Sequence, residues 1–277
     1  MERRKAKRSR RPRRRLATRA DPFDLYQKAV QEPEPDLHLV SRIFRSHYGR
    51  PPRLLREDFC GTGLTACTWV RLHRENRAFG VDLDPAPLAW GRRHNVAALA
   101  PEARARVSLL RGDVRESSPE RAEVTIAFNF SYFVFKTRRE LRAYFESARR
   151  GLRRQGILVL DAYGGADAQR TGEERREVDG FDYVWDQHGF DPISHTVSNY
   201  IHFQFRDGSR LRRAFHYDWR LWSLPEIQEL LLEAGFRTVG CYWEGTDRAT
   251  GEGNSIFTLR RRAEDDPAWV AYLAARV

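Results

Sequence analysis

The chain has 277 residues, enough for one large α/β domain with a sizeable core. Its formal net charge is +11, but residues 1–20 hold eleven Lys or Arg and one acid and contribute +10 of it. The remaining 38 basic and 37 acidic residues nearly cancel, which excludes an extended basic face on the folded body.

Targeting and redox signals are also weak. Residues 1–20 contain no apolar run of signal-peptide length, and no stretch of about 18 apolar residues exists to span a membrane. The three cysteines have neither the number of a disulfide framework nor the spacing of a zinc site. We therefore expect a cytoplasmic protein with no membrane partner and no metal.

The first segment in chain order is the Arg-rich stretch 1–20. It lacks apolar periodicity, so we expect a disordered tail, followed by a single domain over 21–277. The tail is the only part from which we expect contact with nucleic acid, and such binding would be non-specific. A helical segment follows, since apolar residues recur at helical spacing at Leu37, Val40, Ile43 and Phe44.

Extended and helical patterns then alternate along the chain. We expect strands at 53–58, 78–83, 106–113, 122–130 and 156–165, and helices at 64–73, 87–98 and 138–152. Strands that alternate with helices of this length indicate βαβ units and a parallel sheet with helices on both faces. The expected fold class is α/β, doubly wound.

The pattern changes over about 164–222, where aromatic and polar residues alternate in runs separated by the turn 206–209. This predicts an antiparallel β insertion after strand five. A helix follows, with Ser223 as N-cap, Glu226 at the capping-box position and Gly235 as the stop. Extended runs at 237–245 and 254–262 complete the expected elements.

A glycine turn carries the chemistry. Residues 61–66 read G-x-G-x-x-A, and Asp82 ends the next strand 21 residues after Gly61, which would suit a dinucleotide fold of the NAD type. However, the adjacent acids Glu57 and Asp58 would repel a pyrophosphate at the helix N-terminus. A dehydrogenase-like NAD site is therefore the less favoured alternative.

A cofactor with a ribose, a sulfonium and an ammonium group but no phosphate reverses that argument, and S-adenosylmethionine is such a cofactor. Its ammonium can meet Glu57, its carboxylate the helix N-terminus near Gly63, and its ribose diol Asp82. A further acid, Asp113, follows the next strand and can accept a hydrogen bond from an adenine amino group.

At these residues the chain resembles the class I, Rossmann-like methyltransferases that use S-adenosylmethionine, over about residues 50–261. Bacterial members of that family also read REDFCGTG, as residues 56–63 do here. The resemblance implies a mostly parallel seven-stranded sheet with a final antiparallel hairpin. It also implies cofactor-binding roles for Glu57, Phe59, Cys60, Gly61, Thr62, Gly63, Asp82, Leu83, Gly112, Asp113, Val114, Asn129, Phe130 and, on the N-terminal helix, Tyr26.

The chain departs from the family pattern at two places. Phe59 stands where the first motif has its first glycine, and residues 129–132 read Asn-Phe-Ser-Tyr rather than the Asn/Asp-Pro-Pro-Tyr of many nucleic-acid and glutamine methylators. Because a residue with a Cβ adopts a positive φ with difficulty, we expect the close approach to be made after Phe59, with its ring in the core.

Methyl transfer from a sulfonium is an in-line displacement, so positioning in a dry pocket suffices and no catalytic triad is expected. The aromatic side chains of the insertion are the expected pocket walls: Tyr183, Trp185, Tyr217, Trp219 and Trp222. For an acceptor that loses a proton, the candidate bases are His188, His216 and Asp218. The sequence thus predicts methyl transfer to a small molecule; the alternative is an RNA methyltransferase or RNA-binding protein that uses the tail.

Overall fold

The computed structural model describes residues 15–116, 119–247, 250 and 253–277. The predicted disorder of residues 1–14 lies outside the described residues. The end of the predicted tail is ordered, because Leu16–Thr18 form a 3₁₀ turn, η1. Its Leu16 and Ala17 amides donate hydrogen bonds to Asp207 and Ser209 in the insertion, which anchor residues 15–20 to the folded body.

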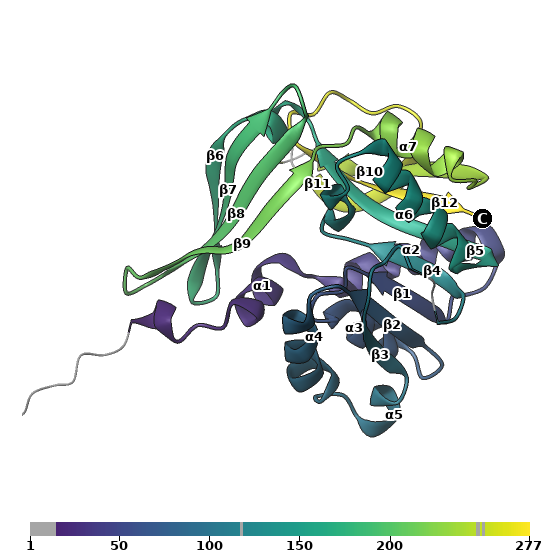
Figure 1. Cartoon of the computed structure of the whole chain (residues 1–277), viewed down its shortest axis with the longest axis horizontal. Coiled ribbons are helices and arrows are strands. Elements are labelled where there is room, and N and C mark those ends of the chain that lie inside the picture. Colours follow the sequence, from purple (N-terminus) through teal and green to yellow (C-terminus); the bar gives the residue numbers. More distant parts are fainter. Residues whose placement is uncertain (1–14, 117–118, 248–249, 251–252) are drawn as a thin grey trace, which may run out of the picture.

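The main sheet has eight strands in the order β11-β10-β12-β5-β4-β1-β2-β3 (Figure 1). Strands β1 to β5 pair in parallel, and β12 runs antiparallel between β5 and β10. The strands are β1 (Leu54–Asp58), β2 (Arg77–Asp82), β3 (Val107–Arg111), β4 (Ala122–Ala127), β5 (Leu152–Gly164), β10 (Thr238–Thr246), β11 (Gly253–Arg260) and β12 (Trp269–Arg276).

This architecture confirms the predicted doubly wound α/β class, but the sheet has eight strands rather than seven. The additional strand is β12, which the sequence analysis did not assign. Its run AWVAYLAAR is rich in alanine, a residue with low strand propensity. Burial between two neighbouring strands decides its conformation, since Ala271, Leu273, Ala274 and Ala275 are all buried.

Helices cover both faces of the main sheet. On one face, α2 and α3 pack against residues of β1, β4, β5 and β12, and on the other face lie α6 and α7. The helices are α1 (Pro22–Val30), α2 (Pro33–Tyr48), α3 (Leu64–Leu72), α4 (Pro85–Gly91), α5 (Pro101–Arg104), α6 (Arg138–Arg150) and α7 (Leu224–Glu233), with a π-turn, η2 (Arg92–Val96), and 3₁₀ turns η3 (Ser131–Val134) and η4 (Ala166–Gln169). The predicted capping box of Ser223 and Glu226 opens α7.

The insertion after β5 forms a second, antiparallel sheet in the order β6-β7-β8-β9. Its strands are β6 (Gly172–Val178), β7 (Phe181–Asp191), β8 (Thr196–Phe205) and β9 (Arg210–Arg220). The predicted hairpin turn at 206–209 is confirmed. The charged strand β6 was not predicted, because its exposed sequence GEERREV has no alternation of apolar and polar residues.

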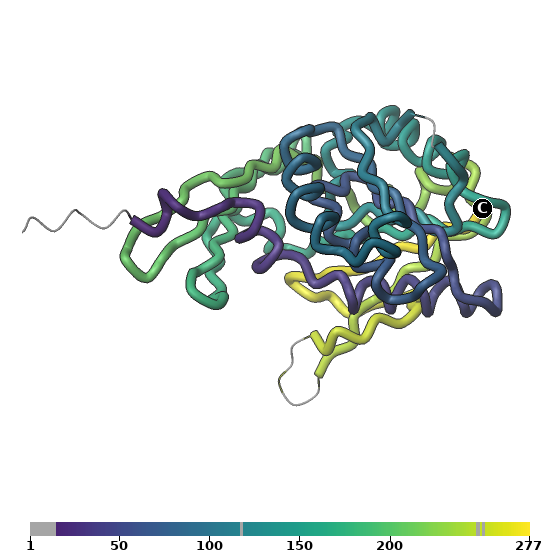
Figure 2. Tube along the Cα trace, turned by 90° about the horizontal axis from the view of Figure 1, so that it is seen from below, coloured from purple at the N-terminus to yellow at the C-terminus, as the bar shows by residue number. Residues whose placement is uncertain are grey.

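The N-terminal segment joins the two sheets. In Figures 1 and 2, α1 lies between the projecting insertion sheet and the body of the main sheet. Leu25 and Ala29 pack on the aromatic face of the insertion, while Trp90 donates a hydrogen bond of 2.6 Å to Asp21. The helix therefore closes one side of the space above the carboxyl ends of the parallel strands. Within the described part of the chain, no helix has the length and apolar character required to cross a bilayer.

Candidate active site

The glycine turn connects β1 to α3 as the motif predicts. Gly61 and Gly63 have φ of +52° and +67°, a conformation that favours glycine. A Cβ on Gly63 would lie 2.4 Å from Leu109 Cδ2, whereas a Cβ on Gly61 would meet nothing within 4 Å. The turn is thus packed closely on one side and open at Gly61.

Phe59 departs from the expectation for this turn. Its φ is +55°, so the left-handed conformation begins at a residue with a Cβ, contrary to the sequence analysis. The expectation that the Phe59 ring lies in the core is met, since the ring packs at centroid distances of 5.9 Å from Phe135 and 5.6 Å from Tyr144. Contacts of the ring with these aromatic side chains offset the backbone strain.

The two adjacent acids point to different partners. Asp58 is buried and bonds to Arg56 Nε at 2.6 Å and to the Tyr144 hydroxyl at 3.0 Å. Arg56 also donates to the Val114 carbonyl. Because a buried carboxylate requires such partners, Asp58 has a structural role beneath the turn. Of the pair, Glu57 is the acid turned toward the glycine turn.

Glu57 accepts a hydrogen bond of 2.8 Å from the Ala66 amide in the first turn of α3. Burial raises the pKa of Glu57 to about 8, and the neighbouring acids Asp82 and Asp58 add to that effect. The described residues place no cationic side chain in a salt bridge with it. A ligand cation at this position would therefore be strongly favoured by the ionised carboxylate.

Asp82 lies opposite the turn at the end of β2. One carboxylate oxygen accepts from the Gly61 amide at 2.7 Å and the other from the Asp84 amide at 2.9 Å. Burial raises its pKa. The next residue, Leu83, is 66% exposed, which leaves an apolar side chain in the open beside a half-buried acid. A ligand with two adjacent rings would fit this combination, the polar ring bonding to Asp82 and the apolar ring lying on Leu83.

The remaining predicted cofactor contacts differ in accessibility. Cys60 is buried against Gly80, and the Thr62 hydroxyl accepts a hydrogen bond of 2.7 Å from Gln27 on α1. After β3, Gly112 is half-buried and Asp113 is held by Arg115 at 2.6 Å. The side chain of Val114 is buried, so it offers little surface to a ligand.

The turn after β4 has two consecutive residues with positive φ, Asn129 at +55° and Phe130 at +56°. Their amides converge on the Asp161 carboxylate at 2.7 and 2.9 Å. Successive left-handed residues form a concave pair of N–H groups that can bind an anion, and here the acceptor is the protein's own carboxyl group. The sequence analysis missed Asp161, although it lies within the strand predicted at 156–165.

Phe130 leads into an aromatic cavity of about 410 Å³ between the two sheets. Tyr183, Trp185, Tyr217 and Trp219 line it as predicted, together with Tyr26 of α1. Trp222 does not, because it is buried in the core and donates to the Phe135 carbonyl. The other lining residues are Val30, Asn129, Phe130, Tyr163, Gly164, Asp167, Ala168, Glu174, Gln187, Ile201, Glu244, Ala268, Trp269 and Val270.

The charged side chains in the described lining of this cavity are all acidic. Its described lining contains the carboxyl groups of Asp167, Glu174 and Glu244 and no Lys, Arg or His. Burial raises the pKa of Tyr26 to about 12, and its hydroxyl bonds to Tyr217. These hydroxyls therefore stay neutral at physiological pH and act as polar walls rather than as bases.

A second cavity of about 590 Å³ adjoins the first and shares Val30 and Asn129 with it. It contains Asp36 and Asp161. Burial raises the pKa of Asp36 to about 6, opposed by its hydrogen bond from Tyr272, and burial raises the pKa of Asp161 to about 8. Both carboxyl groups thus titrate near neutral pH.

The three candidate bases lie elsewhere. On β9, Tyr217 and Trp219 point into the cavity, so the alternate residues His216 and Asp218 lie on the opposite face. There His216 stacks on Tyr200, and Asp218 pairs with Lys136 at 2.5 Å. His188 is exposed and lines neither cavity. The aromatic pattern predicted the walls but could not tell which alternate face was occupied by polar residues.

One cluster of possible metal ligands occurs on the insertion sheet, formed by Glu173, Asp186 and His202. The hydrogen bonds of His202 argue against a metal there. Nδ1 accepts from the Arg213 amide at 2.7 Å, so the proton of the neutral ring lies on Nε2, which donates to Asp186 at 3.2 Å. The imidazole therefore has no lone pair free for a metal.

Comparison with known proteins identifies part of the chain. Residues 59–156 match the family described as a methyltransferase domain, which includes the glycine turn, Asp82 and the turn after β4. The prediction of a methyltransferase enzyme is confirmed by this match. The sequence has no match among curated proteins.

Solved structures share the fold over nearly the whole chain. An S-adenosylmethionine-dependent methyltransferase from Clostridium acetobutylicum has a TM-score of 0.65 at 15% identity and covers 91% of this chain and 96% of its own. An amino pentose methyltransferase from Micromonospora echinaspora has a TM-score of 0.64 at 17% identity, with 92% and 95% covered. A sugar N-methyltransferase from Streptoalloteichus has a TM-score of 0.60 at 17% identity, with 99% of each covered. At these identities the likeness establishes the fold.

The role of Asp161 in holding the turn after β4 can be tested by measuring the stability of a variant. In Asp161→Asn an amide nitrogen would face one of the two backbone N–H groups, so one buried donor loses its acceptor. We expect a loss of about 1–3 kcal/mol in the free energy of unfolding, measured in urea. Asp218→Asn, which breaks an exposed ion pair, should cost less than about 1 kcal/mol. Equal losses in the two variants would contradict the assigned role.

Proposed function

We propose that this protein transfers a methyl group from S-adenosylmethionine to an amine of a small molecule. The observation that carries the proposal is the aromatic cavity beside the Asn129–Phe130 turn, whose described lining holds three carboxyl groups and no basic side chain; only Asp167 is paired, with Arg170 outside the lining. The methyltransferase domain over residues 59–156 supplies the reaction type. The cavity supplies the class of acceptor.

The residues at the carboxyl edge of the sheet fit this cofactor. Glu57 offers a buried carboxyl group that has no cationic partner among the described residues, as an ammonium ligand requires. Asp82 retains lone pairs on both oxygens for ribose hydroxyls after accepting the two backbone hydrogen bonds. Leu83 is exposed where an adenine ring would need an apolar surface. The backbone remains open at Gly61.

Other predicted contacts enter the proposal with smaller roles. Cys60, Thr62 and Gly63 would shape the turn. Asp113 would accept a hydrogen bond from the adenine amino group only while its carboxylate also pairs with Arg115. Gly112 and Val114 would contribute backbone rather than side-chain contacts. Tyr26, Asn129 and Phe130 would lie where the cofactor site meets the aromatic cavity.

The bound cofactor supplies a methyl group on a positively charged sulfur. The protein's part is to exclude water and to hold the acceptor in line, which can account for about 7–11 kcal/mol of a barrier. The indole and phenol rings of Trp185, Tyr217 and Trp219 can hold a cationic or N-methylated group by cation–π contact. Carboxyl groups at the rim attract the ammonium form of the acceptor from solution.

An amine must lose a proton before or during attack. Asp36 and Asp161 are the carboxyl groups best matched to that task, because their raised pKa values lie near neutral pH. They lie in the cavity that adjoins the aromatic one at Asn129. We assign them the candidate role of proton acceptor in place of His188, His216 and Asp218.

The names of structural neighbours agree with this acceptor class, since two of them are an amino pentose methyltransferase and a sugar N-methyltransferase. The RNA alternative receives no such support. A phosphate backbone would be repelled by Asp167, Glu174 and Glu244 at the cavity. We therefore do not retain it as a second function of this site.

Cofactor binding can be measured by calorimetric titration with S-adenosylmethionine. We expect 1:1 binding, weakened in Asp82→Ala by roughly 10- to 150-fold through the loss of a hydrogen bond to a charged group. Asp218→Ala, which also removes one exposed acid, should bind with unchanged affinity. Folded protein that gives no heat at high micromolar cofactor would reject the proposed cofactor.

Glu57 makes binding of the cofactor pH-dependent. Its pKa of about 8 means that the carboxyl group is largely protonated at about pH 6.5, and an ammonium ligand favours the ionised form. We expect binding to release about one proton, and affinity to rise as the pH approaches 8. Titration in buffers of different ionisation enthalpy measures this proton release. The proton release should vanish in Glu57→Gln and persist in Asp218→Asn. Equal proton release by the two variants would exclude Glu57 as the ammonium partner.

The acceptor class can be tested with methyl-labelled cofactor and a metabolite extract. The extract is first separated on a cation exchanger at neutral pH, so that amines are retained and neutral or acidic compounds flow through. We expect labelled product only from the retained fraction, and we expect Trp219→Leu to raise KM for that fraction. Label confined to the flow-through would show that the acceptor is not an amine, while leaving methyl transfer itself supported.

A further inference from the structure

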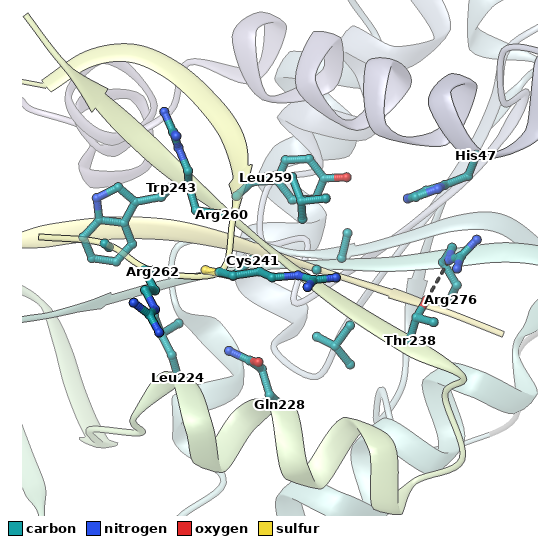
Figure 3. Close-up of a pocket in the computed structure, with 16 residues that line it drawn as sticks. His47, Leu224, Gln228, Thr238, Cys241, Trp243, Leu259, Arg260, Arg262 and Arg276 are labelled. Atoms are coloured by element: carbon teal, nitrogen blue, oxygen red, sulfur yellow. Dashed lines mark hydrogen bonds between the residues drawn. The ribbon is translucent and has the colours of Figure 1, made fainter.

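A cleft lined by arginines lies away from the proposed methyl-transfer site. Figure 3 shows it between α7, which contributes Leu224 and Gln228, and the strands that carry Cys241 and Arg260. Its volume is about 610 Å³. None of its lining residues belongs to either cavity of the candidate active site.

Acidic side chains among the described residues do not neutralise the positive charge of this cleft. Arg260, Arg261, Arg262 and Arg276 line it, and its described lining contains no Asp or Glu. Among the described residues, none of these four side chains takes part in a salt bridge, although most other salt bridges here use arginine. Arg276 makes one neutral contact, from Nε to the Thr238 hydroxyl at 2.7 Å. Like charges held together without partners favour an anionic ligand.

The positive charge of Arg276 affects the pKa of a neighbouring histidine. The pKa of His47, which also lines the cleft, is lowered first by burial and then by the charge of Arg276. The acidic run Glu264–Asp266 follows the arginines in sequence but does not line the cleft. The local potential is thus positive even though residues 21–277 are almost balanced in charge.

Neutral hydrogen-bond groups complete the cleft. Strand β11 pairs with β10 only between Cys241 and Thr246, so residues 238–240 have a strand neighbour, β12, on one side alone. Gln228 is half-buried, and its amide makes no hydrogen bond to the described residues. Burial raises the pKa of Cys241 to about 11, so its thiol stays protonated and adds no negative charge.

We propose that this cleft binds a small organic phosphate. Guanidinium groups match phosphate oxygens in paired hydrogen bonds, and backbone amides on a free strand edge add further donors. Trp243, Leu224 and Val239 provide apolar walls for the organic part of the molecule. A single cleft on a body of balanced charge fits a small ligand better than a nucleic-acid strand, which requires an extended basic track.

The test is calorimetric titration of the full chain with sodium tripolyphosphate at moderate salt. The test variant is the double substitution Arg261→Gln and Arg262→Gln, which removes two exposed side chains that make no hydrogen bond to the described residues. The matched control is Arg206→Gln with Arg212→Gln on the insertion, which are exposed and likewise free of salt bridges among the described residues. Both variants change the net charge equally and keep the basic residues 1–20, so their difference isolates the cleft.

We expect the wild-type protein and the control to bind tripolyphosphate with similar affinity, and the test variant to bind at least about tenfold more weakly, which corresponds to about 1.4 kcal/mol. S-adenosylmethionine affinity should be the same in all three, which separates failure of this proposal from failure of the proposed function. Equal weakening in both variants, or no binding by the wild type, would overturn the proposal and leave the arginines as protection of a sheet edge. A single-stranded oligouridylate that binds more tightly than tripolyphosphate, with the same dependence on Arg261 and Arg262, would also overturn it in favour of RNA.

Discussion

Carboxylates that accept hydrogen bonds from backbone amides hold the carboxyl edge of the main sheet in place. Glu57 binds the first turn of α3, Asp82 binds the glycine turn, and Asp161 binds the turn after β4. Each of these turns presents backbone amides that need a hydrogen-bond acceptor. Because the protein's own carboxyl groups supply that acceptor, the proposed cofactor would bring positive charge rather than phosphate to this edge.

The second sheet turns this edge into an enclosed site. The aromatic face of the insertion and α1 pack together through Leu25, Ile201 and Phe203, and Gln27 reaches the glycine turn at Thr62. A doubly wound sheet alone would leave the space above its strand ends open to solvent. The insertion and the N-terminal helix cover that space with side chains, and a methyl transfer that relies on positioning needs such cover from solvent.

The molecule has one acidic and one basic cavity, and the nearly balanced charge of residues 21–277 does not reveal them. The aromatic cavity is lined by acids and aromatic rings, whereas the described lining of the cleft beside α7 holds four arginines and no acid. Trp243 and Trp269, whose ring centroids are 5.3 Å apart, lie between them and contribute to one region each. The two proposals thus place a cationic acceptor in one region and an anion in the other, on a body whose overall charge is nearly neutral.

The sequence by itself determined the parallel core, the glycine turn, Asp82 and the aromatic insertion, because each depends on local spacing along one or two strands and helices. Only the tertiary structure showed that Asp58 bonds to Arg56 on the same strand and to Tyr144 of α6, which leaves Glu57 as the acid that faces the turn. It likewise decided the strand conformation of the alanine-rich β12, which pairs with residues about 30 and 110 positions away. Period-two alternation predicts that a strand has two faces, but the partner packed against it decides which face carries Tyr217 and which carries His216.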